Sequence, residues 1–269
     1  MGHAAQPRLS AAKEVAVRLR PEGDVLWASI NRPKARNAID AEVIEGFERM
    51  VAVAEESEAK LVVIRGEGGT FCAGADLLEV ERLLSEPAQL REFMVRLGAV
   101  FDRLESAPWV NLAVVEGFAL AGGCELLLAC DVVLAAESAR IGDRHAQYGL
   151  APAGGASVRL TEALPRARAR HLLLSGEMIS GREAAEAGLV SLAVPDELLE
   201  SALGRLVSGL RTRGRSSLRT IKAMIQPPDD PRRRDLLDRE IDLFIEHAGS
   251  EEMRAGLEAF RQRRPANFE

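Results

Sequence analysis

The sequence predicts an α/β protein in which buried strands alternate with helices, and two observations carry this prediction. Short runs of β-branched and aliphatic residues at 61–64 and 110–115 are typical of strands buried on both faces. Between these runs, apolar residues return with helical spacing, as at Val43, Phe47 and Met50. Strands separated by helices form parallel βαβ units, whose functional loops follow the carboxyl ends of the strands. We therefore expect the functional site in the loops after these strands.

The first half of the chain contains the expected strands. Alternating apolar residues on both sides of a turn at 21–24 predict a hairpin near the N-terminus. Asp40 is a suitable N-cap for the helix that carries Phe47 and Met50. Strands are expected at residues 15–19, 25–30, 60–65, 110–115 and 132–135, and helices after Asp40 and at residues 77–84, 90–104 and 124–130.

The second half is expected to be largely helical. Helices are predicted at residues 158–164, 167–174, 180–186, 197–210, 236–246 and 251–263, with a boundary at Pro227, Pro228 and Pro231. The last two helices carry apolar stripes at helical spacing, namely Leu236, Ile241, Phe244 and Ile245, and then Met253, Leu257 and Phe260. These stripes indicate either docking against another subunit or packing onto the chain's own core, and the sequence favours neither.

Composition and charge argue against several classes of protein. Hydrophobic residues make up 47% and charged residues 28% of the 269 residues, which is typical of a folded globular protein. The net charge of -6 argues against nucleic acid as a partner. The three cysteines form no C-x-x-C pair, so no disulfide framework or metal site is indicated, and a reducing cytoplasm fits best. Glu116, Glu125 and Asp131 interrupt the apolar stretch at 110–136, so we expect no membrane span.

Two loops rich in small residues follow predicted strands and lead into helices. They lie at residues 71–77 and 117–125. Small residues let a ligand approach the backbone closely, and the first N–H groups of a helix have no partner within the helix. If the amides of Ala75 and Gly122 point at one place, they form a two-donor oxyanion hole, to which the helix dipole adds.

Glu125 follows Gly122 by three residues, about one helical turn. Its neighbours Cys124 and Leu126 are apolar, which favours burial of the carboxyl group and a raised pKa suited to proton transfer. The alternative is an ordinary charge on an amphipathic helix that interacts with the helix dipole. The apolar neighbours favour the functional interpretation.

Short motifs occur in a fixed order along nearly the whole chain. They lie at residues 31–33, 37–38, 71–77, 117–126, 129–131, 149–152, 154–155, 174–176, 184–185, 188–190 and 264–268. By these motifs the chain resembles the enoyl-CoA hydratase/isomerase (crotonase) superfamily from about Val15 to Phe268. The resemblance implies a crotonase-like spiral of ββα units at residues 1–195 and a helical C-terminal oligomerisation region at 196–269. It also implies a homo-oligomer, either a trimer or a dimer of trimers.

The resemblance implies that an acyl-CoA thioester is the substrate, and because coenzyme A is part of that substrate no separate cofactor is expected. The family's oxyanion amides fall on Ala75 and Gly122, and its first catalytic glutamate falls on Glu125. The residues implied to bind CoA or substrate are Arg36, Ala38, Ala73, Asp76 and Leu77.

The chain departs from the family pattern at two positions. His145 stands where hydratases carry their second glutamate, and Pro265 replaces a lysine that contacts a CoA phosphate, with Arg263 and Arg264 next to it. His145 suits a second acid or base, because its ordinary pKa is near 6.5 and Asp143 can orient it. The alternative is that His145 only shapes the pocket or pairs with the catalytic glutamate.

The replacement of the second glutamate leaves several activities open. A hydratase uses two groups to orient water and to move a proton, whereas a Δ3,Δ2-enoyl-CoA isomerase needs one base that carries a proton between C2 and C4. Related enolate chemistry, such as thioester hydrolysis or decarboxylation, and a non-catalytic acyl-CoA-binding member are further alternatives. Of the other histidines, we expect His171 to be packed within its helix.

Overall fold

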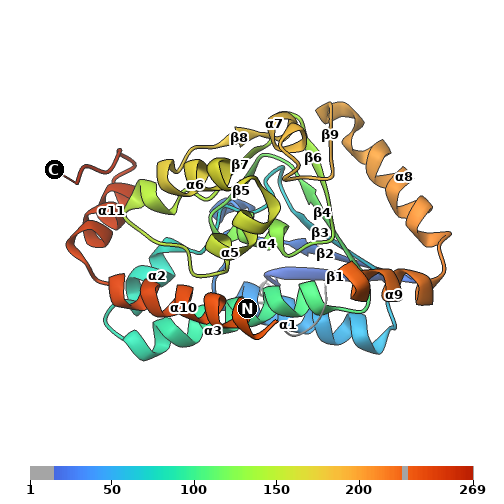
Figure 1. Ribbon diagram of the computed structural model, residues 1–269, viewed down its shortest axis with the longest axis horizontal. Helices are drawn as coiled ribbons and strands as arrows, with labels where there is room; N and C mark the ends of the chain where they lie inside the picture. Colours follow the sequence, from blue (N-terminus) through green and yellow to red (C-terminus); the bar gives the residue numbers. More distant parts are fainter. Residues whose placement is uncertain (1–14, 226–229, 269) are drawn as a thin grey trace, which may run out of the picture.

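The structure is a computed structural model that describes residues 15–225 and 230–268. Its centre is a six-stranded sheet in the order β1-β2-β3-β4-β6-β9 (Figure 1). Strands β1 and β2 are antiparallel and all other neighbours are parallel. These strands span Val17–Glu22, Val25–Ile30, Leu61–Gly66, Val110–Val115, Val132–Ala136 and Leu192–Val194. The predicted α/β class is therefore confirmed, and each of the five predicted strands is present.

A second sheet has three short strands in the order β5-β7-β8, spanning Phe118–Leu120, Arg140–Gly142 and Ile179–Ser180. These strands and β9 were not predicted, because two or three residues are too few to show an alternating pattern. Strands β3 and β4 are parallel neighbours in the large sheet. Their C-terminal loops therefore leave the same edge of that sheet, and the first of them reaches β5 of the small sheet through a bridge between Cys72 and Ala119.

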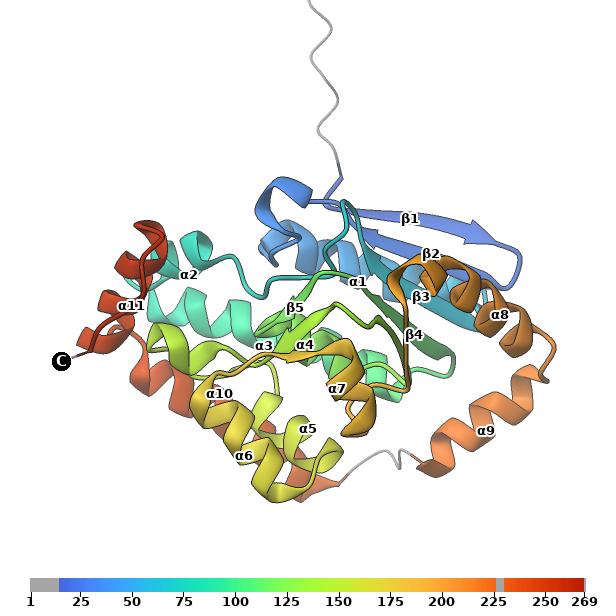
Figure 2. The ribbon, with the colours of Figure 1, turned by 90° about the horizontal axis from the view of Figure 1, so that it is seen from above.

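Helices surround the two sheets (Figures 1 and 2). They are α1 (Ala41–Glu56), α2 (Leu77–Leu83), α3 (Pro87–Ser106), α4 (Gly122–Leu128), α5 (Ala156–Ala163), α6 (Arg166–Ser175), α7 (Gly181–Glu186), α8 (Leu199–Arg211), α9 (Arg215–Ile225), α10 (Pro231–His247) and α11 (Glu251–Arg261). The predicted N-cap is confirmed, since the Asp40 side chain accepts a hydrogen bond of 3.0 Å from the Val43 amide. None of the helices in the described parts of the chain is long and apolar enough to cross a membrane.

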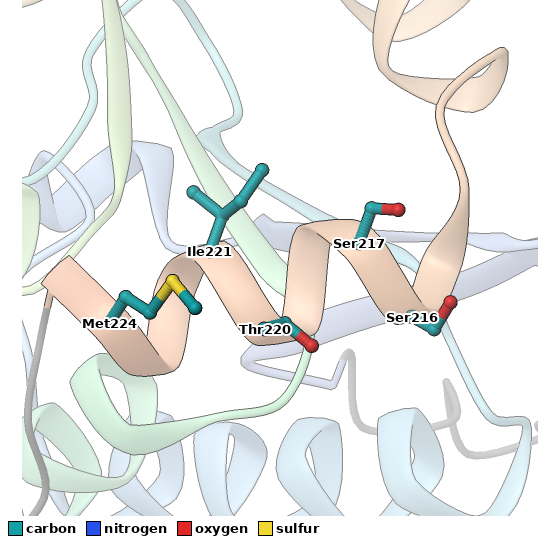
Figure 3. A pocket seen from close by; sticks show the side chains of 5 residues that line it. All are labelled: Ser216, Ser217, Thr220, Ile221 and Met224. Carbon is teal, nitrogen blue, oxygen red and sulfur yellow. The ribbon is translucent and has the colours of Figure 1, made fainter.

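Helix α9 was not predicted, because its buried side is unusually polar. Lys222 is buried there, and its ammonium group donates to the carbonyls of Leu104 and Trp109 and pairs with Asp131 at 2.7 Å. These bonds fix α9 to the end of α3 and to the residues just before β4 and β6. The helix also lines an open pocket (Figure 3). None of the lining residues is a predicted site residue, and they are Ser216, Ser217, Thr220, Ile221 and Met224.

The C-terminal helices α10 and α11 pack largely onto the chain's own core. Helix α10 contacts α3 and α5, and Phe244 and Met253 are buried in the same apolar core as the large sheet. The outer ends of the two predicted stripes stay exposed at Leu236 and Phe260. Pro231 is the first residue of α10, whereas Pro227 and Pro228 lie outside the described residues.

Candidate active site

The two small-residue loops lie side by side. The Cys72 amide donates to the Phe118 carbonyl at 2.9 Å, and the Leu120 amide donates to the Cys72 carbonyl at 3.0 Å. These bonds make residues 71–75 run parallel to residues 118–122. The loop after β3 and the turn into α4 are therefore brought together at the edge where β3 and β4 end.

The amides of Ala75 and Gly122 are neighbours. The Ile39 amide donates to the Gly74 carbonyl at 2.8 Å, and the Asp76 amide donates to the Ile39 carbonyl at 2.7 Å. Because Ile39 thus pairs with the residues on both sides of Ala75, the Ala75 N–H points away from Ile39, to the opposite side. There it faces α4, since a Cβ built on Gly122 would lie 3.3 Å from the Ala75 nitrogen. Within the described parts of the chain, neither amide donates to a backbone carbonyl. Two free donors therefore lie next to each other, as an oxyanion hole requires.

The turn that presents the Gly122 amide is held in a strained conformation. Ala121 has a φ of 49°, which side-chain-bearing residues rarely adopt, and its amide donates to the Gly142 carbonyl at 3.0 Å. Such a conformation costs about 1–3 kcal/mol and persists only where the surroundings enforce it. Here the small sheet enforces it, and the strained turn aims the first amide of α4 toward the loop after β3.

Glu125 is buried on α4 with 2% of its surface exposed. Its Oε1 accepts hydrogen bonds from the amides of Gly154 at 2.8 Å and Ala156 at 3.2 Å, at the start of α5. Among the described residues, its Oε2 has no hydrogen-bond partner. Burial raises the pKa of Glu125 to about 7, although a nearby His145 charge and the Gly154 bond act in the opposite direction. The burial expected for Glu125 is present, and the carboxyl group has one oxygen free for proton transfer.

His145 begins the short helix η2 (His145–Tyr148), which follows β7. Its Nδ1 lies 2.8 Å from a carboxylate oxygen of Asp143, which is 1% exposed. Burial alone lowers the pKa of His145, but the charge and hydrogen bond of Asp143, helped by the charge of Glu125, raise it to about 9. His145 is thus held as a cation at neutral pH, oriented by Asp143 and close enough to Glu125 for their charges to interact.

The residues expected to bind CoA or substrate have different surroundings. Arg36 is exposed, with its guanidinium over the Phe118 ring at 5.5 Å, and its carbonyl accepts from the Ala73 amide at 3.1 Å. Asp76 caps α2 through the Leu78 amide, and its carboxylate pairs with Arg32 at 3.0 Å. The other three are partly buried: Ala38 between β2 and α1, Ala73 in the loop after β3, and Leu77 as the first residue of α2.

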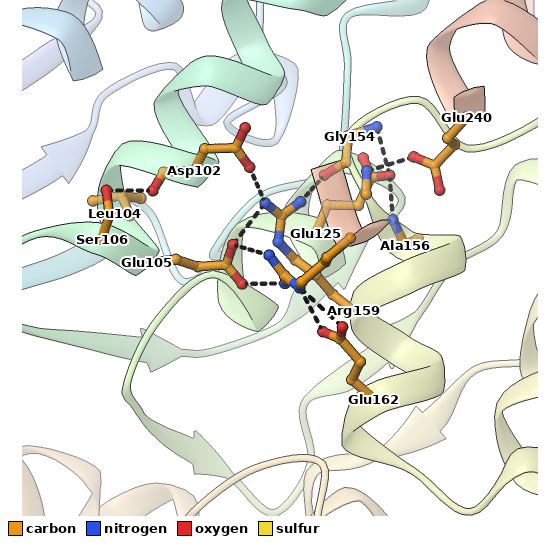
Figure 4. Close-up of polar contacts among 12 residues, drawn as sticks. Asp102, Leu104, Glu105, Ser106, Glu125, Gly154, Ala156, Arg159, Glu162 and Glu240 are labelled. Atoms are coloured by element: carbon orange, nitrogen blue, oxygen red, sulfur yellow. Dashed lines mark hydrogen bonds and ion pairs between the residues drawn. The ribbon is translucent and has the colours of Figure 1, made fainter. Parts of the chain in front are cut away.

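The polar groups behind Glu125, which Figure 4 shows, were not predicted from the sequence. Glu240, from α10, is 6% exposed and accepts from the amides of Gly155 and, at 2.8 Å, Ser157. Arg159 is also buried, and its guanidinium donates to the Gly154 carbonyl at 2.7 Å. The only available signal was the Gly154-Gly155 pair, because the sequence does not reveal which distant carboxylate a turn will bind.

The buried cysteines close to the site are poor nucleophiles. Burial raises the pKa of Cys72 to about 12 and that of Cys124 well above its ordinary value, so both remain thiols. In residues 15–225 and 230–268, no group of three or more His, Cys, Asp or Glu side chains is arranged to hold a metal ion. The groups predicted for this site are two backbone amides, one carboxyl group and one imidazole.

Comparison with known proteins identifies the family. The enoyl-CoA hydratase/isomerase family model matches residues 21–269. A 2,3-dehydroadipyl-CoA hydratase of Escherichia coli strain K12 is 36% identical over 247 residues, which cover 91% of this chain and 94% of that protein. A crotonyl-CoA hydratase of Syntrophomonas wolfei is 32% identical, covering 89% and 92%. The crystal structure of an enoyl-CoA hydratase from Mycobacterium avium subsp. paratuberculosis matches with a TM-score of 0.85 at 29% identity, covering 94% and 98%. The chain therefore belongs to the enoyl-CoA hydratase/isomerase family and has the α/β fold of its solved members.

Proposed function

We propose that the protein adds water across the C2=C3 double bond of a 2-enoyl-CoA thioester. One observation carries the proposal: two free amides, of Ala75 and Gly122, lie together one helical turn from the buried carboxyl group of Glu125. Hydration of such a substrate places negative charge on the thioester oxygen, and paired amides stabilise that charge. The E. coli and S. wolfei relatives are both named as hydratases of CoA thioesters, which supports this reaction class.

Glu125 and His145 divide the proton transfers in this proposal. Glu125 takes a proton from the water molecule as its oxygen bonds to C3, and the electrons of the double bond move to the thioester oxygen between the two amides. Protonated His145 then gives its proton to C2, which restores the thioester carbonyl. Transfer of the proton from Glu125 to His145 returns both groups to their starting states. Their raised pKa values suit these roles, since a raised pKa makes the Glu125 carboxylate a stronger base and keeps His145 protonated at neutral pH.

The experiment that tests the proposed function compares 2-enoyl with 3-enoyl thioesters as substrates. We expect the protein to convert crotonyl-CoA to a 3-hydroxyacyl-CoA, detected by mass spectrometry as the addition of one water. Conversion of a 3-enoyl thioester to a 2-enoyl thioester with no water uptake would instead identify an isomerase. Binding of these thioesters without turnover of any would indicate an acyl-CoA-binding protein and contradict the proposal.

The opposite requirements of the two groups predict a bell-shaped pH dependence of kcat/KM. Activity should rise near pH 7 as Glu125 loses its proton and fall near pH 9 as His145 loses its own. Asp143 raises the pKa of His145 through its charge and a hydrogen bond, and that of Glu125 through its charge alone. Asp143→Asn should therefore move the alkaline limb further to lower pH than the acid limb. Steady-state assays between pH 5 and pH 10 at constant ionic strength measure both limbs, and an alkaline limb that Asp143→Asn does not move would contradict the role of His145.

A further inference from the structure

Two buried carboxylates share the start of α5 (Figure 4). Glu125 binds the amides of Gly154 and Ala156, and Glu240 binds those of Gly155 and Ser157. The four amides alternate along the chain, so the two carboxylates approach the turn from different sides. The free N–H groups of a helix start attract negative charge, and here each of these four is occupied.

A third side chain also binds the turn that lies between the two carboxylates. Arg159 donates to the Gly154 carbonyl at 2.7 Å and pairs with Glu105 at 2.9 Å and with Asp102. A Cβ on Gly154 would lie 2.4 Å from Oε2 of Glu125, so the turn is in close contact with that carboxyl group as well as hydrogen-bonded to it. The position of Glu125 therefore depends on a turn that Glu240 and Arg159 hold in place.

Resting on the hydratase function proposed above, we propose that Glu240 is a positioning residue for Glu125. It fixes the turn that binds the Glu125 carboxylate, and its negative charge makes Glu125 a stronger base. Glu240 belongs to α10, so this inference gives the C-terminal segment a part in the chain's own active site. The catalytic contact itself remains with Glu125.

The electrostatics of the site agree with this geometry. The charge of Glu240 raises the pKa of Glu125, as do burial and Asp143, while His145 lowers it. Several titratable or charged groups surround Glu125. They are Asp143 before η2, His145 at the start of η2, Glu240 on α10, Arg159 on α5 with its partners Asp102 and Glu105 on α3, and the thiols of Cys72 and Cys124. Of these, only Glu240 is a carboxylate that binds the same turn as Glu125.

The test replaces Glu240 with glutamine, which keeps the shape of the side chain and removes its charge. We expect the acid limb of the kcat/KM profile to move down by about one pH unit, the scale on which neighbouring charges shift side-chain pKa values. We also expect kcat with crotonyl-CoA to fall by about tenfold, because a carboxamide cannot accept from both amides, while KM changes little. Glu162→Gln is the matched control, since Glu162 lies on α5 and pairs with Arg233 at 2.9 Å but does not bind the turn. An unmoved acid limb together with an unchanged kcat would overturn the proposal.

A second variant separates charge from position. Glu240→Asp keeps the charge and shortens the side chain, so kcat should fall while the acid limb stays near its wild-type pH. This variant also tests the positioning role if the glutamine variant does not fold, and a wild-type kcat in Glu240→Asp would then contradict the proposal. A fall in kcat accompanied by a rise in KM, both in proportion to a lowered Tm, would show that Glu240 has a purely structural role and would contradict the proposal.

A measurement without substrate distinguishes failure of this inference from failure of the proposed function. Carbon-13 NMR of protein labelled at its glutamate carboxyl groups follows the titration of Glu125, whose signal is assigned by its absence from Glu125→Gln. The midpoint of that titration should be lower in Glu240→Gln than in the wild type. A lower midpoint in a protein that hydrates no 2-enoyl thioester would keep the electrostatic coupling and reject the hydratase function, whereas an unchanged midpoint would reject the coupling itself.

Discussion

Glu125→Gln is expected to lower kcat with crotonyl-CoA by about 10²–10⁴-fold, the usual contribution of a positioned acid or base. The glutamine has the shape of the glutamate, and its carbonyl oxygen can still accept from the Gly154 and Ala156 amides. It cannot take a proton from water at neutral pH. Binding of a CoA ligand should therefore remain close to wild type, as measured by isothermal titration calorimetry alongside the steady-state assay.

Glu116→Gln is a suitable control for this experiment. Glu116 follows β4 and pairs with Arg65 at 3.2 Å, so it lies near the loops but binds neither of the two amides nor the start of α5. We expect this variant to retain wild-type kcat. Full activity of Glu125→Gln would contradict the assignment of Glu125 as the base, and loss of ligand binding together with activity would show that the substitution disturbed the pocket.

Gly122→Ala is expected to lower kcat/KM by about 10²–10³-fold, the effect typical of losing one oxyanion donor. The new methyl group would lie 3.3 Å from the Ala75 nitrogen, in the space that the thioester oxygen needs. Gly122 is the first residue of α4 and does not have a positive φ, so its backbone conformation suits alanine, and the tight contact requires the Ala75 backbone to shift by only a few tenths of an ångström. The loss should therefore be much larger in the assay than in the Tm.

The matched control is Gly98→Ala, within α3. A Cβ there would meet only the end of the Ile241 side chain at 3.8 Å, so the same chemical change is accommodated. Alanine also favours a helix over glycine by about 1 kcal/mol. We expect unchanged activity and an equal or higher Tm. Wild-type activity in Gly122→Ala would mean that the thioester oxygen lies elsewhere.

The strands and most helices were predictable because their signals are local. A run such as residues 61–64 is apolar on both faces, and β3 is indeed buried on both. The helix at Gly122 begins two residues before the predicted start, since Gly122 and Gly123 carry no side chains that could reveal a period. His171 was predicted to be packed, and this was wrong, because it lies on the exposed side of α6 and pairs with Glu177.

The candidate site, too, was predictable only where its residues carry a local signal. The sequence pointed to Glu125 because its apolar neighbours indicate burial, and it pointed to Ala75 and Gly122 because each lies in a loop of small residues. It did not indicate Glu240, which is 85 residues from Gly155 and meets it only through the packing of α10 against α5. Contacts between distant segments arise from the tertiary fold, and a single sequence carries no local signal for them.

The most direct measurement of the central claim is a crystal structure of the Glu125→Gln protein with crotonyl-CoA bound. The thioester oxygen should lie about 3 Å from the amide nitrogens of both Ala75 and Gly122, with C2 and C3 between residue 125 and His145. A thioester oxygen that is hydrogen-bonded to other groups, and to neither of these two amides, would contradict the account.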